Sequence, residues 1–126
     1  MVQTDFLNLV VDTVETNCKI TGIRTDTLVD GGIFATIGSG RNQAVYYDRS
    51  AIRLWPVKFM AKDTDHEKCI SQLDAICTYL QKLKKYPKHN GFVWLDATVE
   101  KYPARKEKQD SEAHVYMCKI NMQVYY

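Results

Sequence analysis

The chain is poor in the residues that catalytic and metal-binding sites use. Its 126 residues include only three histidines and four cysteines, and no two cysteines form a CxxC pair. The histidines lie far apart and match no HxxxH spacing, whereas a zinc site needs three or four converging ligands. We therefore expect no metal site and reduced, buried thiols that pack as small hydrophobic side chains. The four cysteines are Cys18, Cys69, Cys77 and Cys118.

Glycine-rich and acidic motifs of known chemistry are also missing. The segment Gly38-Ser39-Gly40-Arg41 follows a predicted strand, but it has neither the GxxxxGK[ST] of a P-loop nor the GxGxxG of a dinucleotide site. Asp26 and Asp30 do not have the spacing of an EF-hand loop. Asp63 and Asp65 flank a predicted helix start, where capping accounts for them without an acid-base role. These absences predict a chain with no catalytic residue and no cofactor.

Long apolar runs and a strong excess of one charge are absent as well. No apolar run approaches the roughly 18 to 20 residues of a membrane span. The N-terminal MVQTDFLNLVVDTVETN carries acidic residues and no basic region, unlike a signal peptide. The 17 basic residues nearly balance 15 acidic ones, so bulk charge gives no argument for nucleic-acid binding. We expect a single cytosolic domain over residues 1–126.

Hydrophobic periodicity predicts the elements of this domain. Apolar positions at i, i+3, i+4 and i+7 predict a helix that begins after an N-cap at Thr4 and ends near Asn17. The segment 41–50 is polar, and it is expected to be either a loop or an edge segment. The other predicted elements are strands over 33–37, 52–61, 92–99 and 116–126, and a helix over 64–83. This order predicts an α+β domain with two helices packed on one face of a mostly antiparallel sheet.

Local signals add detail to these elements. Pro56 cannot donate to a strand ladder, which predicts a bulge or a sheet edge there. Thr64 and Glu67 fit a capping box at the start of the second helix. Alternation predicts that one face of the strand over 92–99 carries Val93, Leu95, Ala97 and Val99. The predicted core face of the second helix comprises Cys69 or Ile70, Leu73, Ile76, Cys77, Leu80 and Leu83.

The C-terminal strand has the clearest period of two. Alternate residues from Tyr116 to Tyr126 are apolar, while Lys119, Asn121 and Gln123 face the other way. The preceding segment, residues 100–112, is dense in charge and poor in hydrophobic residues. It predicts a long hairpin tip that is mobile when free.

One part of the chain resembles a known family. The segment LWPVKFMAKD, Leu54–Asp63, and the helical LDAICTYL, Leu73–Leu80, resemble the small minor capsid proteins of long-tailed bacteriophages. Those proteins are similar in turn to the tail terminator, or tail completion, proteins of the phage head–tail junction. The order of elements extends the resemblance over nearly the whole chain. It implies a structural virion protein, assembled in the host cytoplasm and located at the head–tail interface.

The resemblance also implies partners. Tail terminators form a ring, usually a hexamer, that caps the tail tube protein and presents a surface to the head connector protein. Such a ring admits non-specific contact between genomic DNA and positive residues of its lumen. Because the family has no catalytic residues, the resemblance assigns no individual site. The loops of the family do the docking, and by position the candidate segments here are 38–50 and 100–112. The candidate docking or lumen residues are Arg41, Lys101, Arg105, Lys106 and Lys108.

Three other interpretations stay open. The first is a head completion protein or connector adaptor at the same junction. The second is a small α+β ligand-binding domain, which predicts an apolar cavity between helices and sheet. The third is an enzyme whose residues come together from distant positions, such as His66 or His114 with a cysteine. Exposed aromatic contacts are a further interpretation of Tyr46-Tyr47 and Tyr125-Tyr126, with core packing as the alternative for Tyr126.

Overall fold

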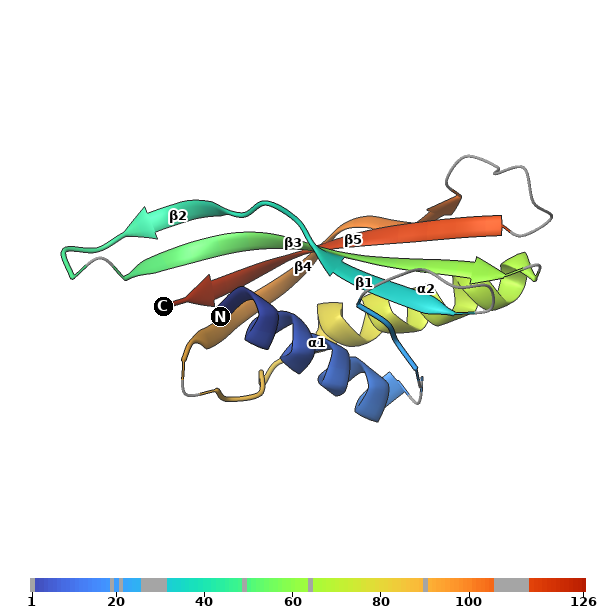
Figure 1. Cartoon of the computed structure of the whole chain (residues 1–126), viewed down its shortest axis with the longest axis horizontal. Coiled ribbons are helices and arrows are strands. Elements are labelled where there is room, and N and C mark those ends of the chain that lie inside the picture. Colours follow the sequence, from blue (N-terminus) through green and yellow to red (C-terminus); the bar gives the residue numbers. More distant parts are fainter. Residues whose placement is uncertain are drawn as a thin grey trace.

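Two helices and five strands make up the secondary structure of the described residues (Figure 1). The computed structural model describes residues 2–18, 20, 22–25, 32–48, 50–63, 65–89, 91–105 and 114–126. The elements in chain order are α1 (Val2–Cys18), β1 (Ile33–Ile37), β2 (Arg41–Val45), β3 (Ala51–Asp63), α2 (His66–Lys82), β4 (Val93–Arg105) and β5 (His114–Tyr125). This is the predicted α+β fold class, and the segment 41–50 contributes an edge strand.

All five strands join in one antiparallel sheet with the order β1–β3–β5–β4. The long strand β3 is central, because β5 pairs with it on one side along its whole length. On its other side β3 pairs with β1 over one half and with β2 over the other half. The chain passes from β1 to β2 through Gly38, Ser39 and Gly40.

Both helices pack on the same face of this sheet (Figure 1). Phe6 of α1 lies at the centre of an aromatic cluster, with ring centroids 5.4 Å from Trp55, 5.5 Å from Phe92 and 5.4 Å from Trp94. The helix α2 contributes five fully buried side chains, which are Cys69, Leu73, Ile76, Cys77 and Leu80. The opposite face of the sheet carries neither helix, and we call it the bare face.

The predicted core faces of α2 and β5 are confirmed in their main part. Alternate residues of β5 from Tyr116 to Val124 are buried, as the period of two predicts. In α2 the core position is Cys69, because Ile70 is exposed. Cys118 is buried like Cys69 and Cys77, whereas Cys18 is half-buried.

The helix starts differ from the prediction. Helix α1 begins at Val2, so Thr4 lies inside the helix and is not its N-cap. A helix start on the surface does not depend on a polar cap, because water satisfies its first N–H groups. The N-cap of α2 is Asp65, whose side chain accepts hydrogen bonds from the main-chain N–H groups of Glu67 and Lys68. The predicted capping residue Thr64 lies outside the described residues.

Pro56 lies in the central strand β3, at a point where this strand pairs with no strand on one side, which agrees with the predicted local edge. The main-chain oxygen of Pro56 accepts a hydrogen bond from the Gly38 N–H at 2.7 Å. It therefore faces the break between β1 and β2, whose pairings with β3 end at Val57 and begin again at Leu54. The N–H that proline lacks would point into this break, where no strand needs it.

Strand β4 departs from the prediction in two ways. A register shift between Trp94 and Asp96 changes which alternate residues of the strand face the core. Trp94 and Ala97 are buried, while Val93 and Leu95 are exposed. A bulge of this kind breaks the period of two that placed all four apolar residues on one face. The strand also continues to Arg105, so residues 100–105 belong to the sheet and not to a hairpin tip. Residues 106–112 of that predicted tip lie outside the described residues.

Candidate functional site

Three lysines of neighbouring strands lie side by side on the bare face. The strand register places Lys58 of β3 opposite Lys119 of β5, and Lys119 opposite Lys101 of β4. Lys58 alternates with the buried Val57 and Phe59, which places its side chain on the bare face. We call Lys58, Lys101 and Lys119 the lysine row. Like charges in directly opposite positions are destabilising, so this arrangement has a cost for the isolated fold.

One carboxylate lies within the lysine row. The Lys119 Nζ lies 2.8 Å from Glu100 Oε2. The hydrogen bond from Lys119 lowers the pKa of the Glu100 carboxyl group, and the charges of Lys119 and Lys101 act in the same direction. Glu100 therefore stays ionised and compensates one of the three lysine charges, which leaves the row cationic.

A shallow cavity of about 270 Å³ opens beside the row on the bare face. Arg41 lies at this cavity because it pairs with Leu54 at the start of β2. It adds a fourth positive charge next to Lys119 and Glu100. The cavity is lined by Ser39, Arg41, Leu54, Pro56, Glu100, Lys119 and Asn121.

The structure brings together only part of the predicted site. Arg41 and Lys101 both lie beside Lys119 and Glu100. Arg105 is the last residue of β4, where the register pairs it with Tyr116. The predicted Lys106 and Lys108 lie outside the described residues. Neither Lys58 nor Lys119 is among the predicted site residues, although both occupy outward positions of alternating strands.

A second feature is the hairpin formed by β2 and the first part of β3, residues 41–54, which we call the arm. It projects beyond the two helices at one end of the molecule (Figure 1). Its tip exposes three consecutive large side chains: Val45 is 62% exposed, Tyr46 is 48% exposed and Tyr47 is fully exposed. We call these three residues the arm tip.

Hydrogen bonds hold the turn next to the arm tip. The Tyr46 N–H donates to the main-chain oxygen of Ser50 at 2.9 Å. Asp48 Oδ1 accepts hydrogen bonds from the hydroxyl and the N–H of Ser50, and these bonds lower the pKa of the Asp48 carboxyl group. The Tyr125 hydroxyl donates to Ser50 Oγ at 2.9 Å, and its ring lies 6.1 Å from that of Tyr46. The turn is therefore fixed to the sheet before any partner binds.

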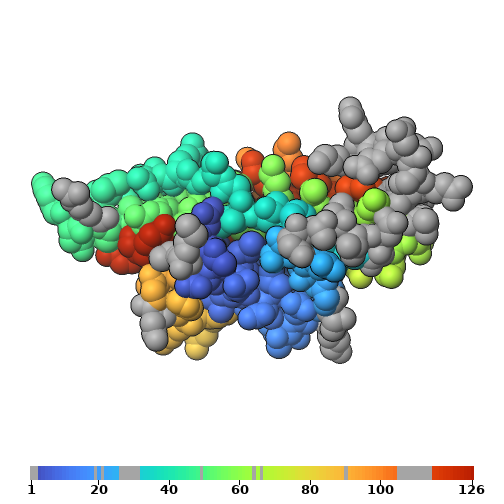
Figure 2. Space-filling model, viewed as in Figure 1, coloured from blue at the N-terminus to red at the C-terminus, as the bar shows by residue number. Residues whose placement is uncertain are grey.

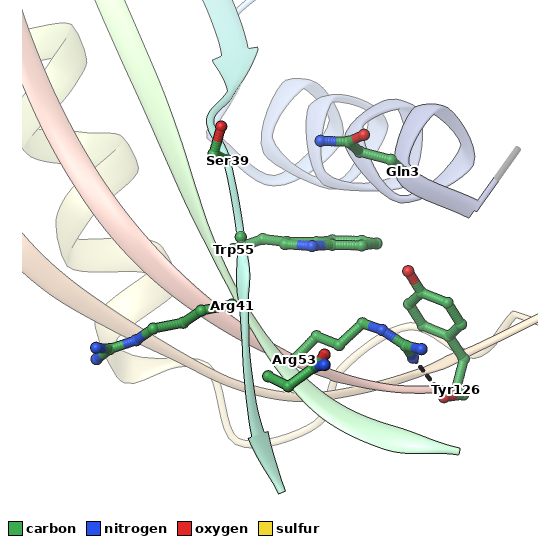
Figure 3. A pocket seen from close by; sticks show the side chains of 8 residues that line it. Gln3, Ser39, Arg41, Arg53, Trp55 and Tyr126 are labelled. Atoms are coloured by element: carbon green, nitrogen blue, oxygen red, sulfur yellow. Dashed lines mark hydrogen bonds between the residues drawn. The ribbon is translucent and has the colours of Figure 1, made fainter. Parts of the chain in front are cut away.

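The root of the arm contains a pocket of about 600 Å³ (Figure 3). The Arg53 guanidinium lies 3.5 Å above the centre of the Tyr126 ring and donates to the main-chain oxygen of Tyr126. The Tyr126 ring also packs at 5.6 Å from the Trp55 ring and is half-buried, which agrees with the packing interpretation. Gln3 and Ser39 lie on the other side of the indole, while Arg41 points away from it (Figure 3).

Phe6, Leu73 and Ile120 are fully buried between the helices and the sheet. The two pockets described above lie at the arm root and on the bare face. Within the described residues, no three His, Cys, Asp or Glu side chains form a group that could hold a metal ion. None of the helices in the described part of the chain is long and apolar enough to cross a membrane.

Comparison with known protein families and with curated protein sequences gives no match.

Proposed function

We propose that this chain is a structural virion protein of the phage head–tail junction. In this role, copies form a ring that caps the tail tube, ends its growth and joins it to the head connector. The protein has no turnover in this proposal; it acts by docking. The sequence resemblance described above suggests this role, and the following features of the structure support it.

The observation that carries the proposal is the arm tip. Val45, Tyr46 and Tyr47 expose large side chains at the end of a projecting hairpin, where they contribute little to the core. Tyrosine is enriched where proteins contact each other, because its ring gives a large contact area and its hydroxyl group a hydrogen bond. The hydrogen bonds around Ser50 fix the turn, which lowers the entropy lost on docking. A fixed, exposed, aromatic tip suits a protein that docks on a large partner such as a tail tube.

The face of the sheet that carries no helix gives a second argument for the proposed ring. Both helices cover one face, so the bare face is available for a neighbouring copy or another partner. Apolar side chains that are only half-buried, including Leu54, Met60 and Met117, lie there beside the charged residues. A ring needs two contact surfaces on each copy in addition to the surface that docks on the tube. The arm tip, the bare face and the outer surface of the helices supply three separate surfaces.

The proposal is tested with purified protein and tail tubes. Light scattering gives the mass of the protein alone, and negative-stain electron microscopy shows whether rings form, either free or on tube ends. We expect rings on tube ends and shorter tubes when tube protein polymerises in the presence of this chain. A protein that stays monomeric and leaves tube length and tube ends unchanged would contradict the proposal.

A further inference from the structure

We infer that copies of this chain associate head to tail, with the outer side of α1 of one copy on the lysine row of the next. This inference rests on the proposed ring. It names the two surfaces that close the ring, which the resemblance does not assign.

The outer side of α1 is acidic. Asp5, Asp12 and Glu15 are its only charged residues, and the helix contains no lysine or arginine. At 100° per residue these three positions fall within about 80° of one another around the helix axis. Asp5 and Asp12 are exposed, and Glu15 is half-buried and accepts a hydrogen bond from the Gly22 N–H. We call these three residues the acidic stripe.

The acidic stripe and the lysine row point in opposite directions. Phe6, Val10 and Val14 lie on the other side of α1 and are fully buried towards the sheet. The lysine row lies on the far face of that sheet. In Figure 2 the helix α1, in dark blue, forms part of the outer surface of the molecule. Opposite charges on opposite sides favour association between unlike surfaces of two copies.

The spacing of the charges also agrees. Asp5 and Asp12 are seven residues apart, which is about 10.5 Å along a helix axis. Lys58 and Lys101 are separated by two strand spacings across β3, β5 and β4, which is about 9.6 Å. A helix that crosses the three strands can therefore place one carboxylate near each outer lysine. The half-buried Met60 and Met117 lie one outward position farther along β3 and β5 and would meet apolar parts of the neighbour.

Contact between two different surfaces is heterologous. Repetition of one such contact gives a ring when the rotation between copies closes, and a filament when it does not. The neighbour's carboxylates would also relieve the repulsion among the three lysines, for which Glu100 is the one compensating carboxylate within the described residues. The unfavourable arrangement of three neighbouring lysines in the isolated chain is therefore stabilised in the assembled ring.

Charge reversal on each surface tests the inference. The first variant combines Lys58→Glu with Lys119→Glu, and the second combines Asp5→Lys with Asp12→Lys. A third variant carries all four substitutions. The control combines Lys82→Glu with Lys85→Glu, which changes the net charge as the first variant does, at exposed positions that belong to neither surface. A milder pair, Lys58→Gln with Lys119→Gln, replaces the first variant if that variant does not unfold cooperatively like the wild type.

The measured quantities are the concentration at which half of the chains associate and the fraction of capped tube ends. We expect each two-residue reversal to raise that concentration at least about tenfold at low salt, because like charges then face each other. The control should stay near the wild-type value. The four-residue variant should associate again, and so should an equimolar mixture of the two reversed variants, in which every acidic surface finds a basic one.

Other outcomes overturn the inference in distinguishable ways. If the reversed variants associate like the wild type, or if the four-residue variant is no better than either reversal, these surfaces do not meet. If reversal of the lysine row removes binding to duplex DNA but leaves association unchanged, the row contacts DNA and not a second copy. Both results leave the proposed ring in place. A wild-type chain that is monomeric alone and on tubes removes the ring and the inference together.

Discussion

Gly40 lies against the indole of Trp55 at the point where the chain enters the arm. A β-carbon built on Gly40 would lie 1.9 Å from Trp55 Cδ1, 2.4 Å from Trp55 Nε1 and 2.9 Å from the main-chain oxygen of Leu54. No side chain fits at these distances without movement of the indole or of β3. Trp55 in turn packs on Phe6, so this contact ties the root of the arm to the core.

We predict that Gly40→Ala lowers the free energy of unfolding by about 1–3 kcal/mol, the range for overpacking in a well-packed site. Urea unfolding followed by tryptophan fluorescence measures this. Gly91→Ala is the matched control, because the nearest atoms to its β-carbon belong to His89 at 3.4 and 3.5 Å. The control should change the free energy by less than about 0.5 kcal/mol. Equal stability of the two variants would show that the indole moves aside at little cost.

The turn of the arm gives a prediction about pH. The hydroxyl group and N–H of Ser50 both donate to Asp48, and they lower the pKa of its carboxyl group. Ser50→Ala removes the hydroxyl group and keeps the N–H, so the pKa of Asp48 should rise part of the way to its ordinary value. A carbon-detected NMR titration of the Asp48 carboxyl group measures the change. Glu100 on β4, whose pKa is lowered by its hydrogen bond from Lys119, serves as the internal reference, and its pKa should be the same in both proteins.

The sign of the related stability effect follows from the lowered pKa. The Asp48–Ser50 interaction contributes fully above the pKa of Asp48 in the unfolded chain, and the contribution is lost as pH falls through the lower, folded pKa. Ser50→Ala should therefore reduce the acid sensitivity that this turn contributes. A pKa of Asp48 that is the same with and without the hydroxyl group would contradict the described hydrogen bond.

Sequence periodicity predicted the elements that have one buried and one exposed side. Strand β5 alternates from Tyr116 to Val124, and α2 repeats its apolar residues from Cys69 to Leu80. Both patterns result from packing against a single neighbouring layer, so they are visible in the local sequence. The α+β class followed from the order of these elements along the chain.

The features that sequence reasoning missed depend on pairing between distant segments. For the segment 41–50 the sequence left a loop and an edge segment open; β2 is polar and short, and it is a strand because β3 offers an edge beyond the end of β1. The bulge after Trp94 changes which side chains of β4 are buried, and only the register with β5 defines it. The lysine row likewise depends on the register of three strands. The local sequence around Lys58 and Lys119 therefore does not show that these two residues are neighbours. Arg41 belongs to the segment expected to be a loop or an edge segment, and Lys101 to the predicted hairpin tip; both lie in strands.

The exposed edge of β4 leads to a further prediction. Two side chains from outside the sheet accept hydrogen bonds from its N–H groups: Gln81 Oε1 from Val99 at 2.9 Å, and the Tyr86 hydroxyl from Ala97 at 3.2 Å. We expect Gln81→Ala combined with Tyr86→Phe to cost about 0.5–1.5 kcal/mol for each hydrogen bond. The variant should also aggregate faster, because an open strand edge pairs with other chains.

Thermal unfolding and light scattering against time measure the two effects. Gln72→Ala is the control, since this glutamine of α2 makes no hydrogen bond to β4 among the described residues. It should match the wild type in aggregation rate. If the double variant is as stable and as soluble as the wild type, water replaces both side chains without loss, and the edge needs no such cover.

The arm tip gives the prediction closest to the proposed function. Tyr47 is fully exposed, so Tyr47→Ser should change the free energy of unfolding by less than about 0.5 kcal/mol. A tyrosine at the centre of an interface typically contributes more than 1 kcal/mol to binding, so the same change should weaken tube capping by about tenfold. The control is Tyr102→Ser, which removes another exposed tyrosine, on β4 and away from the arm. Binding of labelled protein to tail tubes, measured by sedimentation, should separate the two variants. Equal binding of both would show that the arm tip is not the docking surface, since the two substitutions remove the same side chain and differ only in place.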